Sequence, residues 1–125
     1  MDVNLRILVA DAHAGMRGII VSLLGAEFDV VGAVSGGEQL VRAAMELKPD
    51  VIVSDIYMPK LTGIEAQESL QALGINIPFV FVSVNPYFTQ KVMKRLGQFV
   101  TKEDLVSNLN AAVAQSTVRN SSYTH

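Results

Sequence analysis

The chain has 125 residues, half of them hydrophobic, which is enough for one domain with a core and too short for two ordinary domains. Its net charge of −2 lacks the basic footprint of nucleic-acid binding, so no nucleic-acid contact is expected within this chain. The absence of cysteine excludes disulfides, thiolate metal sites and a cysteine nucleophile, and it fits a cytoplasmic location. No apolar stretch approaches the ~20 residues of a membrane-spanning helix, so no membrane association is expected.

Short apolar runs alternate along the chain with segments of helical periodicity. The runs predicted to be strands are residues 5–10, 29–34, 51–54, 79–82 and 99–100. Because these runs are apolar at most of their positions, the sheet that they form should be covered on both faces, which is typical of a parallel sheet. The sequence therefore predicts an α/β domain with a five-stranded, parallel, doubly wound sheet.

Five helical segments alternate with these strands. The positions expected to face the core, at i, i+3, i+4 spacing, are Met16, Ile19, Ile20, Leu23 and Leu24 in the first helix, Leu40, Val41, Ala44 and Met45 in the second, Ala66, Leu70 and Leu73 in the third, and Leu105, Val106, Leu109, Ala112 and Val113 in the last. The fourth helix, residues 86–96, is short and weakly patterned. Residues 35–38 and 62–65 have the spacing of capping boxes, and Gly74 is the expected stop of the third helix.

The composition changes near the end of the chain. After Ala114 the residues turn polar, with a Gln-Ser-Thr run and then an Asn-Ser-Ser run. We therefore expect one domain over residues 1–115 and a polar tail over residues 116–125, which is either frayed or the start of a linker.

Polar side chains follow the predicted strands where each one ends. Asp11 follows the first strand, Asp55 ends the third, Ser83 follows the fourth and Lys102 lies just beyond the fifth. The carboxyl ends of parallel strands meet at one edge of a sheet, where open α/β folds bind their ligands. Two carboxylates can hold Mg²⁺, a lysine and a hydroxyl can bind phosphoryl oxygens, and a central aspartate can itself be the nucleophile toward phosphorus.

Two segments around these positions carry a more specific pattern. Residues 7–17 read Ile-Leu-Val-Ala-Asp-Ala-His-Ala-Gly-Met-Arg, and residues 55–66 contain Asp-x-x-Met-Pro-x-x-x-Gly directly after an apolar strand. In these segments, and over essentially its whole length, the chain resembles the receiver domains of two-component response regulators, with an opening similar to that of LuxR-type regulators. The resemblance implies a flavodoxin-like (βα)5 fold and a signalling protein rather than an enzyme.

The resemblance also implies a role for individual residues. Asp55 would accept a phosphoryl group from a histidine kinase in a Mg²⁺-dependent reaction. The implied metal ligands are Asp11, Asp55 and the backbone carbonyl of Tyr57, and the implied phosphoryl-binding residues are Ser83 and Lys102. Phe99 matches the aromatic residue that changes rotamer on activation, so the output face would switch around Phe99 and the last helix.

Two departures from the family pattern affect this expectation. Ala12 stands where the family usually has a second acid that contacts the metal, and a methyl group cannot bind a hard cation. Mg²⁺ binding should therefore be weaker, by more than the ~10–100-fold that follows the loss of a residue supporting a metal ligand. Val84 follows Ser83 where Ala or Gly is usual, and its branched side chain could crowd the path to Asp55.

These departures leave other functions open. The chain could be a receiver that works without phosphorylation, as an interaction module or a homodimer, and Asp11 could pair with Lys102 in a purely structural salt bridge. A small enzyme or flavin carrier on the same topology is disfavoured, because the chain has neither glycine-rich nucleotide-binding motif and no tryptophan. If the chain is a fragment, a DNA-binding output domain could follow it.

Overall fold

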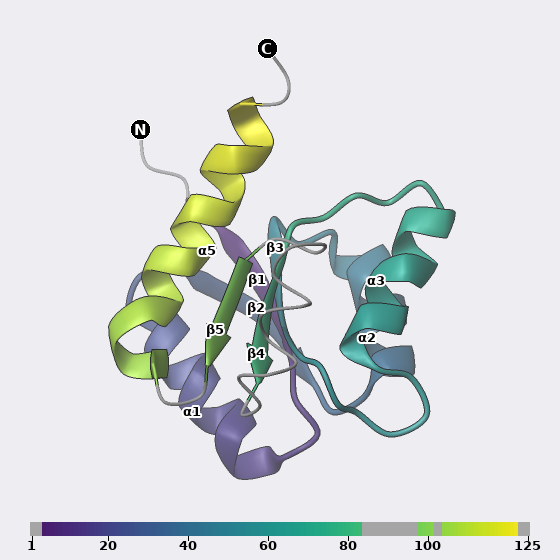
Figure 1. Cartoon of the computed structure of the whole chain (residues 1–125), viewed down its shortest axis with the longest axis horizontal. Coiled ribbons are helices and arrows are strands. Elements are labelled where there is room, and N and C mark those ends of the chain that lie inside the picture. The colour runs from purple at the N-terminus through teal and green to yellow at the C-terminus, as the bar shows by residue number, and fades with distance from the viewer. Residues whose placement is uncertain (1–3, 84–97, 102–103, 123–125) are drawn as a thin grey trace.

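The computed structural model describes residues 4–83, 98–101 and 104–122 (Figure 1). Its centre is a five-stranded sheet with the strand order β2-β1-β3-β4-β5, and every neighbouring pair of strands is parallel. The strands are β1 (Arg6–Ala10), β2 (Asp29–Val34), β3 (Val51–Asp55), β4 (Phe79–Ser83) and β5 (Gln98–Thr101). The predicted parallel, doubly wound sheet is confirmed.

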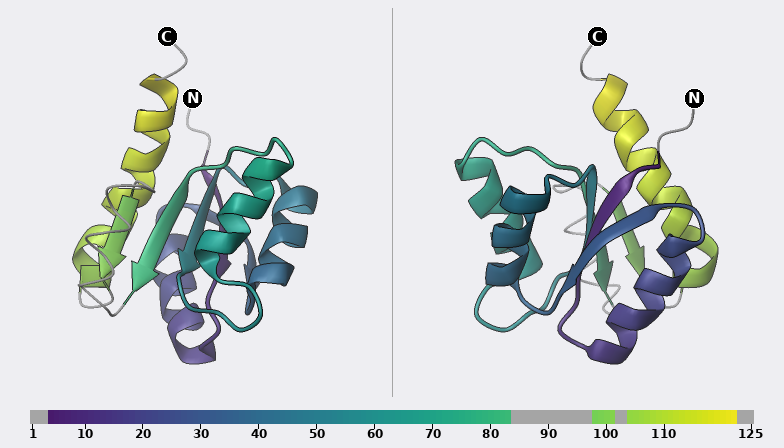
Figure 2. Two further views of the ribbon diagram at one scale, coloured as in Figure 1. Left: turned by 45° about the vertical axis from the view of Figure 1, so that its right-hand side comes forward. Right: turned by 180° about the vertical axis from the view of Figure 1, so that it is seen from behind.

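Helices cover both faces of this sheet. They are α1 (Ala14–Gly25), α2 (Gly37–Leu47), α3 (Gly63–Ala72) and α5 (Leu105–Ser122). Helices α1 and α5 lie on one face, and α2 and α3 lie on the other (Figures 1 and 2). In the part of the chain that the structure describes, no helix is both long and apolar enough to cross a bilayer.

Each layer of helices has its own hydrophobic core, and the strands supply alternate residues to the two. In β3, Val51 and Val53 pack with α1 and α5, while Ile52 between them packs with α2 and α3. Side chains of successive strand residues point to opposite faces, so a strand buried on both faces must be apolar throughout. This explains why β1, β3 and β4 appear in the sequence as short, mainly apolar runs.

Four apolar helix positions that were predicted to face the core are exposed instead. They are Ile19 (50% exposed), Met45 (47%), Leu73 (57%) and Val106 (83%). Three of them stand beside a buried residue in the sequence, and a helix turns by about 100° per residue, so a helix lying on a sheet buries only one of the two. Leu73 caps the C-terminus of α3, beyond its last core-facing turn.

One of the two predicted capping boxes is confirmed and the other is wrong. At α3, the Glu65 N–H donates to Thr62 Oγ1 (3.1 Å) and the Thr62 N–H donates to Glu65 Oε1 (2.9 Å). At α2, the N-cap is Gly36 rather than Ser35, so the third helical residue is Gln39, and its Oε1 accepts the Ser35 N–H (3.0 Å). A one-residue shift of the helix start therefore replaced Glu38 with Gln39 as the capping partner.

The two predicted ends of helices also have different outcomes. Gly74 follows α3 with a left-handed φ of 79°, a conformation that glycine adopts without steric cost, so the predicted stop is confirmed. Helix α5 continues through the first polar residues of the tail to Ser122, and the division into a domain and a tail stays a prediction. Ser116 and Thr117 donate their hydroxyls to the backbone carbonyls of Val113 and Ala114 (2.7 and 2.9 Å), so both hydroxyls have a partner within the helix.

Candidate functional site

Three of the predicted site residues lie at one edge of the sheet. Ala10 of β1 pairs with Ser54 of β3, so Asp11 and Asp55 follow at the same level on neighbouring strands. Asp55 pairs with Val82 of β4, which places Ser83 one step further along the next strand. Figure 2 shows these strands ending together, away from the C-terminal end of α5.

The three polar side chains at this edge are buried. Asp11 is fully buried, Ser83 is 1% exposed, and Asp55 is 9% exposed. Buried carboxylates are expensive unless they are hydrogen-bonded, paired or bound to a metal, so acids in this position indicate a binding site rather than a surface feature. Of these three residues, Asp55 keeps the largest exposed fraction.

Asp11 is held from three directions. Its N–H donates to the carbonyl of Val34 in β2 (3.0 Å), and its own carbonyl accepts Arg17 Nη1 of α1 (2.8 Å). Its side-chain Oδ1 accepts the N–H of His13 (2.9 Å). Ala12, between these contacts, is exposed and leaves the Asp11 carboxylate as the single acid of this loop.

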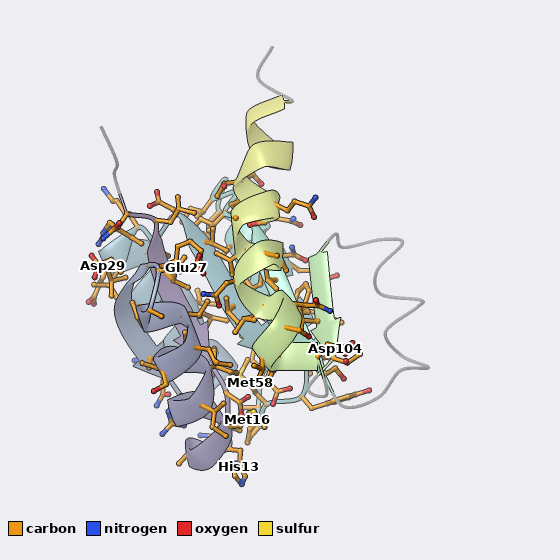
Figure 3. All side chains as sticks on the ribbon, turned by 90° about the vertical axis from the view of Figure 1, so that its left-hand side faces the viewer. His13, Met16, Glu27, Asp29, Met58 and Asp104 are labelled. Atoms are coloured by element: carbon orange, nitrogen blue, oxygen red, sulfur yellow. The ribbon has the colours of Figure 1, made fainter. Side chains whose placement is uncertain are left out.

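His13 is a helix cap in this structure. Its Nδ1 accepts the N–H of Met16 (3.1 Å), which makes it the N-cap of α1, and Figure 3 shows it at the tip of that helix. An N-cap acceptor satisfies one of the amides that the first helical turn leaves unpaired. The cap accounts for the position of the His13 side chain at the start of α1.

The backbone of Asp55 is fixed as firmly as that of Asp11. Ser54 Oγ donates to the Asp55 carbonyl (2.8 Å), and the Gly63 N–H donates to the carbonyl of Ile56 (2.8 Å). A Cβ on Gly63 would overlap the Asp55 carbonyl oxygen and lie 2.7 Å from Ser54 Oγ. The first turn of α3 therefore lies directly against the backbone of Asp55, an approach that only glycine permits.

The turn before α3 is strained. The Leu61 N–H donates to the Pro59 carbonyl (2.8 Å) across Lys60, whose φ is 71°. This is a γ-turn with a left-handed central residue, a rare conformation that a side chain with a Cβ adopts at a steric cost. The strain lies in the loop that also carries the Tyr57 carbonyl, one of the metal ligands implied by the resemblance.

Replacing Lys60 with glycine should relieve this strain. We expect Lys60→Gly to raise the free energy of unfolding by about 1 kcal/mol, because glycine adopts positive φ at no steric cost. Urea denaturation measures the change. Lys60→Ala is the matched control, since it removes the same side chain and keeps the Cβ. An equal gain in both variants would show that the side chain, and not the backbone, is responsible.

The oxygen atoms at this edge suit Mg²⁺. The ion binds through one or two carboxylates and keeps several waters for phosphate oxygens, and Asp11 and Asp55 are two buried acids at the ends of neighbouring strands. Within the described ranges, no three His, Cys, Asp or Glu side chains gather as a metal cluster. The residues thus fit the ion with one acid fewer than the family pattern, which the sequence traced to Ala12.

Several predicted residues lie outside the described part of the chain. These are Lys102, Val84 and the predicted fourth helix at residues 86–96. Phe99 belongs to β5, where its backbone pairs with Phe81, but its side chain is not among those described. Their proposed roles, including the switch at Phe99, stay predictions.

Two residues that fix the site were not singled out from the sequence. Ser54 is the one hydroxyl in an otherwise apolar strand before Asp55, and that interruption was a usable signal. Arg17 stands four residues after His13 in a helix with no other charge, but its bond to Asp11 depends on how α1 returns along the sheet. Of the two, only the role of Arg17 required the tertiary structure to be recognised.

The strand order and the buried acids at the strand ends define a flavodoxin-like α/β domain with an acidic site. Residues 7–114 match the family model of the response regulator receiver domain. The chain belongs to this family and is a receiver domain of two-component signalling, so the resemblance seen in the sequence is confirmed.

Similar proteins agree with this assignment. Response regulator GacA of Pseudomonas viridiflava is 36% identical over 104 residues, which cover 78% of this chain and 48% of GacA. A protein-glutamate methylesterase/protein-glutamine glutaminase of Clostridium acetobutylicum is 30% identical over 138 residues, which cover 94% of this chain and 39% of the relative. The chain thus spans less than half the length of both relatives.

Solved structures show the same fold. The response regulator domain of Thermotoga maritima CheB superposes with a TM-score of 0.71 at 29% identity, covering 94% of this chain and 93% of that one. The receiver domain of the NarL regulator from Mycobacterium tuberculosis superposes with a TM-score of 0.80 at 21% identity, covering 91% and 96%. At that identity the second likeness concerns the fold alone.

Proposed function

We propose that Asp55 accepts a phosphoryl group from a histidine kinase in a Mg²⁺-dependent reaction, and that the domain then changes its face around Phe99 and α5. The observation that carries the proposal is the position of Asp55, which is buried at the end of the central strand β3, level with Asp11 at the end of the neighbouring strand β1. We further propose residues 1–115 as the receiver unit, with a histidine kinase as its partner.

The reaction needs a nucleophile with little freedom to move. A carboxylate oxygen of Asp55 forms the new P–O bond as the bond between phosphorus and the kinase imidazole nitrogen breaks, and that nitrogen keeps the electron pair and takes up a proton. Ser54 and the first turn of α3 hold the Asp55 backbone in place for this attack. The Ser83 hydroxyl, on the next strand, can donate to a phosphoryl oxygen.

The metal would be held by Asp11, Asp55 and the Tyr57 carbonyl. When bound, Mg²⁺ would neutralise the negative charge that the phosphoryl oxygens bring to the two carboxylates. Lys102 is proposed to bind a phosphoryl oxygen as well. The proposal includes no turnover of a separate substrate, since the product is the acyl phosphate of the domain itself.

Incubation with acetyl phosphate and excess Mg²⁺ tests the proposal. We expect the intact mass to rise by one phosphoryl group, and we expect hydroxylamine to remove the adduct as it does an acyl phosphate. Asp55→Asn, which keeps the size of the side chain, should gain nothing, and neither should the wild-type chain with the metal chelated. A wild-type chain that gains no phosphoryl group under saturating Mg²⁺ would contradict the proposal.

One observation favours a second function, that of a receiver working without phosphorylation through a partner or as a homodimer. Ala12 is exposed beside Asp11 and leaves the loop with a single acid. This function predicts that Asp55→Asn changes neither the oligomeric state of the protein in solution nor its binding to a partner. A change of assembly state with phosphorylation, seen by light scattering, would favour the first function instead.

A further inference from the structure

Arg17 ties both ends of the turn that carries Asp11. Its backbone N–H donates to the carbonyl of His13 (2.9 Å), and its side-chain Nη1 donates to the carbonyl of Asp11 (2.8 Å). The turn of residues 11–13 is therefore closed at its start by the side chain of Arg17 and at its end by the backbone of the same residue. The side chain is half-buried against this turn rather than extended into solvent.

The orientation of the Asp11 carboxylate depends on the same turn. Oδ1 of Asp11 accepts the N–H of His13, and His13 is itself held as the N-cap of α1 by the Met16 N–H. The His13 N–H belongs to the next peptide, so an uncompensated rotation about the backbone bonds of Asp11 or Ala12 would move it away from Oδ1 and release the side chain. Arg17 opposes that rotation because its guanidinium binds the Asp11 carbonyl of this peptide.

The placement of Arg17 is electrostatically unfavourable in two respects. It lies at the start of α1, where the helix dipole favours negative charge, and it puts a positive charge beside the acids expected to bind a cation. If its charge were what mattered, its removal would strengthen Mg²⁺ binding. If its hydrogen bond to Asp11 is what matters, removal would weaken Mg²⁺ binding, so the two roles predict opposite signs.

We infer that Arg17 is a positioning residue that holds the Asp11 carboxylate in the orientation in which it binds the metal cation. The inference rests on the proposed function, because it takes Asp11 as a metal ligand. Ala12 makes the orientation more important in this chain, since Asp11 is the single acid that the loop offers. Hydrogen bonds that support a ligand change metal affinity by about 10–100-fold in other proteins.

Calorimetric titration of Mg²⁺ into the wild type, Arg17→Met and Arg17→Lys tests the inference. We expect Arg17→Met to weaken Mg²⁺ affinity about tenfold even though it removes a positive charge. Arg17→Lys keeps the charge and one donor, and it should recover part of the affinity. Arg42→Met is the matched control, because Arg42 is an exposed arginine of α2, and it should leave the affinity unchanged. Unchanged or stronger binding by Arg17→Met overturns the inference.

Hydrogen exchange without metal supplies an independent measurement. The His13 amide, which donates to Asp11 Oδ1, should exchange about tenfold faster in Arg17→Met, while the amide of Leu24, deep in the same helix, should keep its protection if α1 is intact. An unchanged His13 rate overturns the inference. If Arg17→Met does not fold, the same two measurements are made on Arg17→Lys, with smaller shifts in the same directions.

The two measurements separate the inference from the proposed function. A wild-type chain that does not respond to Mg²⁺ contradicts the metal-dependent reaction at Asp55. In that case the exchange rate of the His13 amide still decides whether Arg17 orients Asp11. A wild-type chain that binds Mg²⁺, with an Arg17→Met variant of equal affinity, overturns the positioning role and leaves the proposed function standing.

Discussion

Replacing Ala12 with aspartate should tighten Mg²⁺ binding by at least about tenfold. Ala12 is exposed and directly follows Asp11, so a carboxylate can be added there without disturbing the core. Two unit charges at 4 Å attract each other by about 4 kcal/mol at the effective dielectric constant of a protein surface, which exceeds the 1.4 kcal/mol of a tenfold change. Calorimetric titration at fixed ionic strength measures the effect.

The control for this prediction is Ala14→Asp. Ala14 is the first residue of α1 and is also exposed, so the variant adds the same charge two residues away from the position that the family uses for its second acid. Both variants add one negative charge near the site, but only position 12 offers it as a direct ligand, and salt weakens a charge effect through solvent more than it weakens a direct contact. Equal gains in the two variants would show that Ala12→Asp acts through net charge alone, against the interpretation of Ala12 as a lost ligand.

Replacing Gly63 with alanine should lower the free energy of unfolding by about 3 kcal/mol. The new Cβ would overlap the Asp55 carbonyl oxygen, and backbone on both sides of the contact must move to make room for it. Overpacking of this kind costs about 1–3 kcal/mol, and here it is backbone rather than a flexible side chain that must give way. Because Asp55 moves with the contact, phosphorylation of the folded fraction should fall as well.

Gly18→Ala is the matched control for Gly63→Ala. Gly18 lies within α1, and among the described residues no neighbouring atom comes within 4 Å of the place where its Cβ would stand. An alanine there should raise the free energy of unfolding by about 0.5–1 kcal/mol, because glycine is a poor residue in a helix interior. Urea denaturation of both variants measures the difference. A loss below 1 kcal/mol for Gly63→Ala would contradict the close approach of α3 to Asp55.

The sequence determined the sheet and the edge at which the acids meet. Runs that are apolar at most positions indicate a sheet buried on both faces. In a parallel sheet the carboxyl ends of the strands lie at one edge. Asp11, Asp55 and Ser83 could therefore be placed together before any coordinates were known, and the structure has them on neighbouring strands. The capping box at Thr62 was equally local, since both of its hydrogen bonds join Thr62 and Glu65, three residues apart.

The tertiary structure decided how the helices lie on that sheet and which residues of the site they hold in place. Periodicity gives the width of an apolar face, but where a helix sits on the sheet decides that Ile20 is buried and its neighbour Ile19 is half exposed. The sequence marks Gly63 as the glycine of the Asp-x-x-Met-Pro-x-x-x-Gly pattern, but only the tertiary structure shows the contact behind it, because α3 approaches β3 so closely that a Cβ there would overlap the Asp55 carbonyl oxygen. The bond from Arg17 to Asp11 arises in the same way, because it forms only when α1 packs back against the strand that it follows.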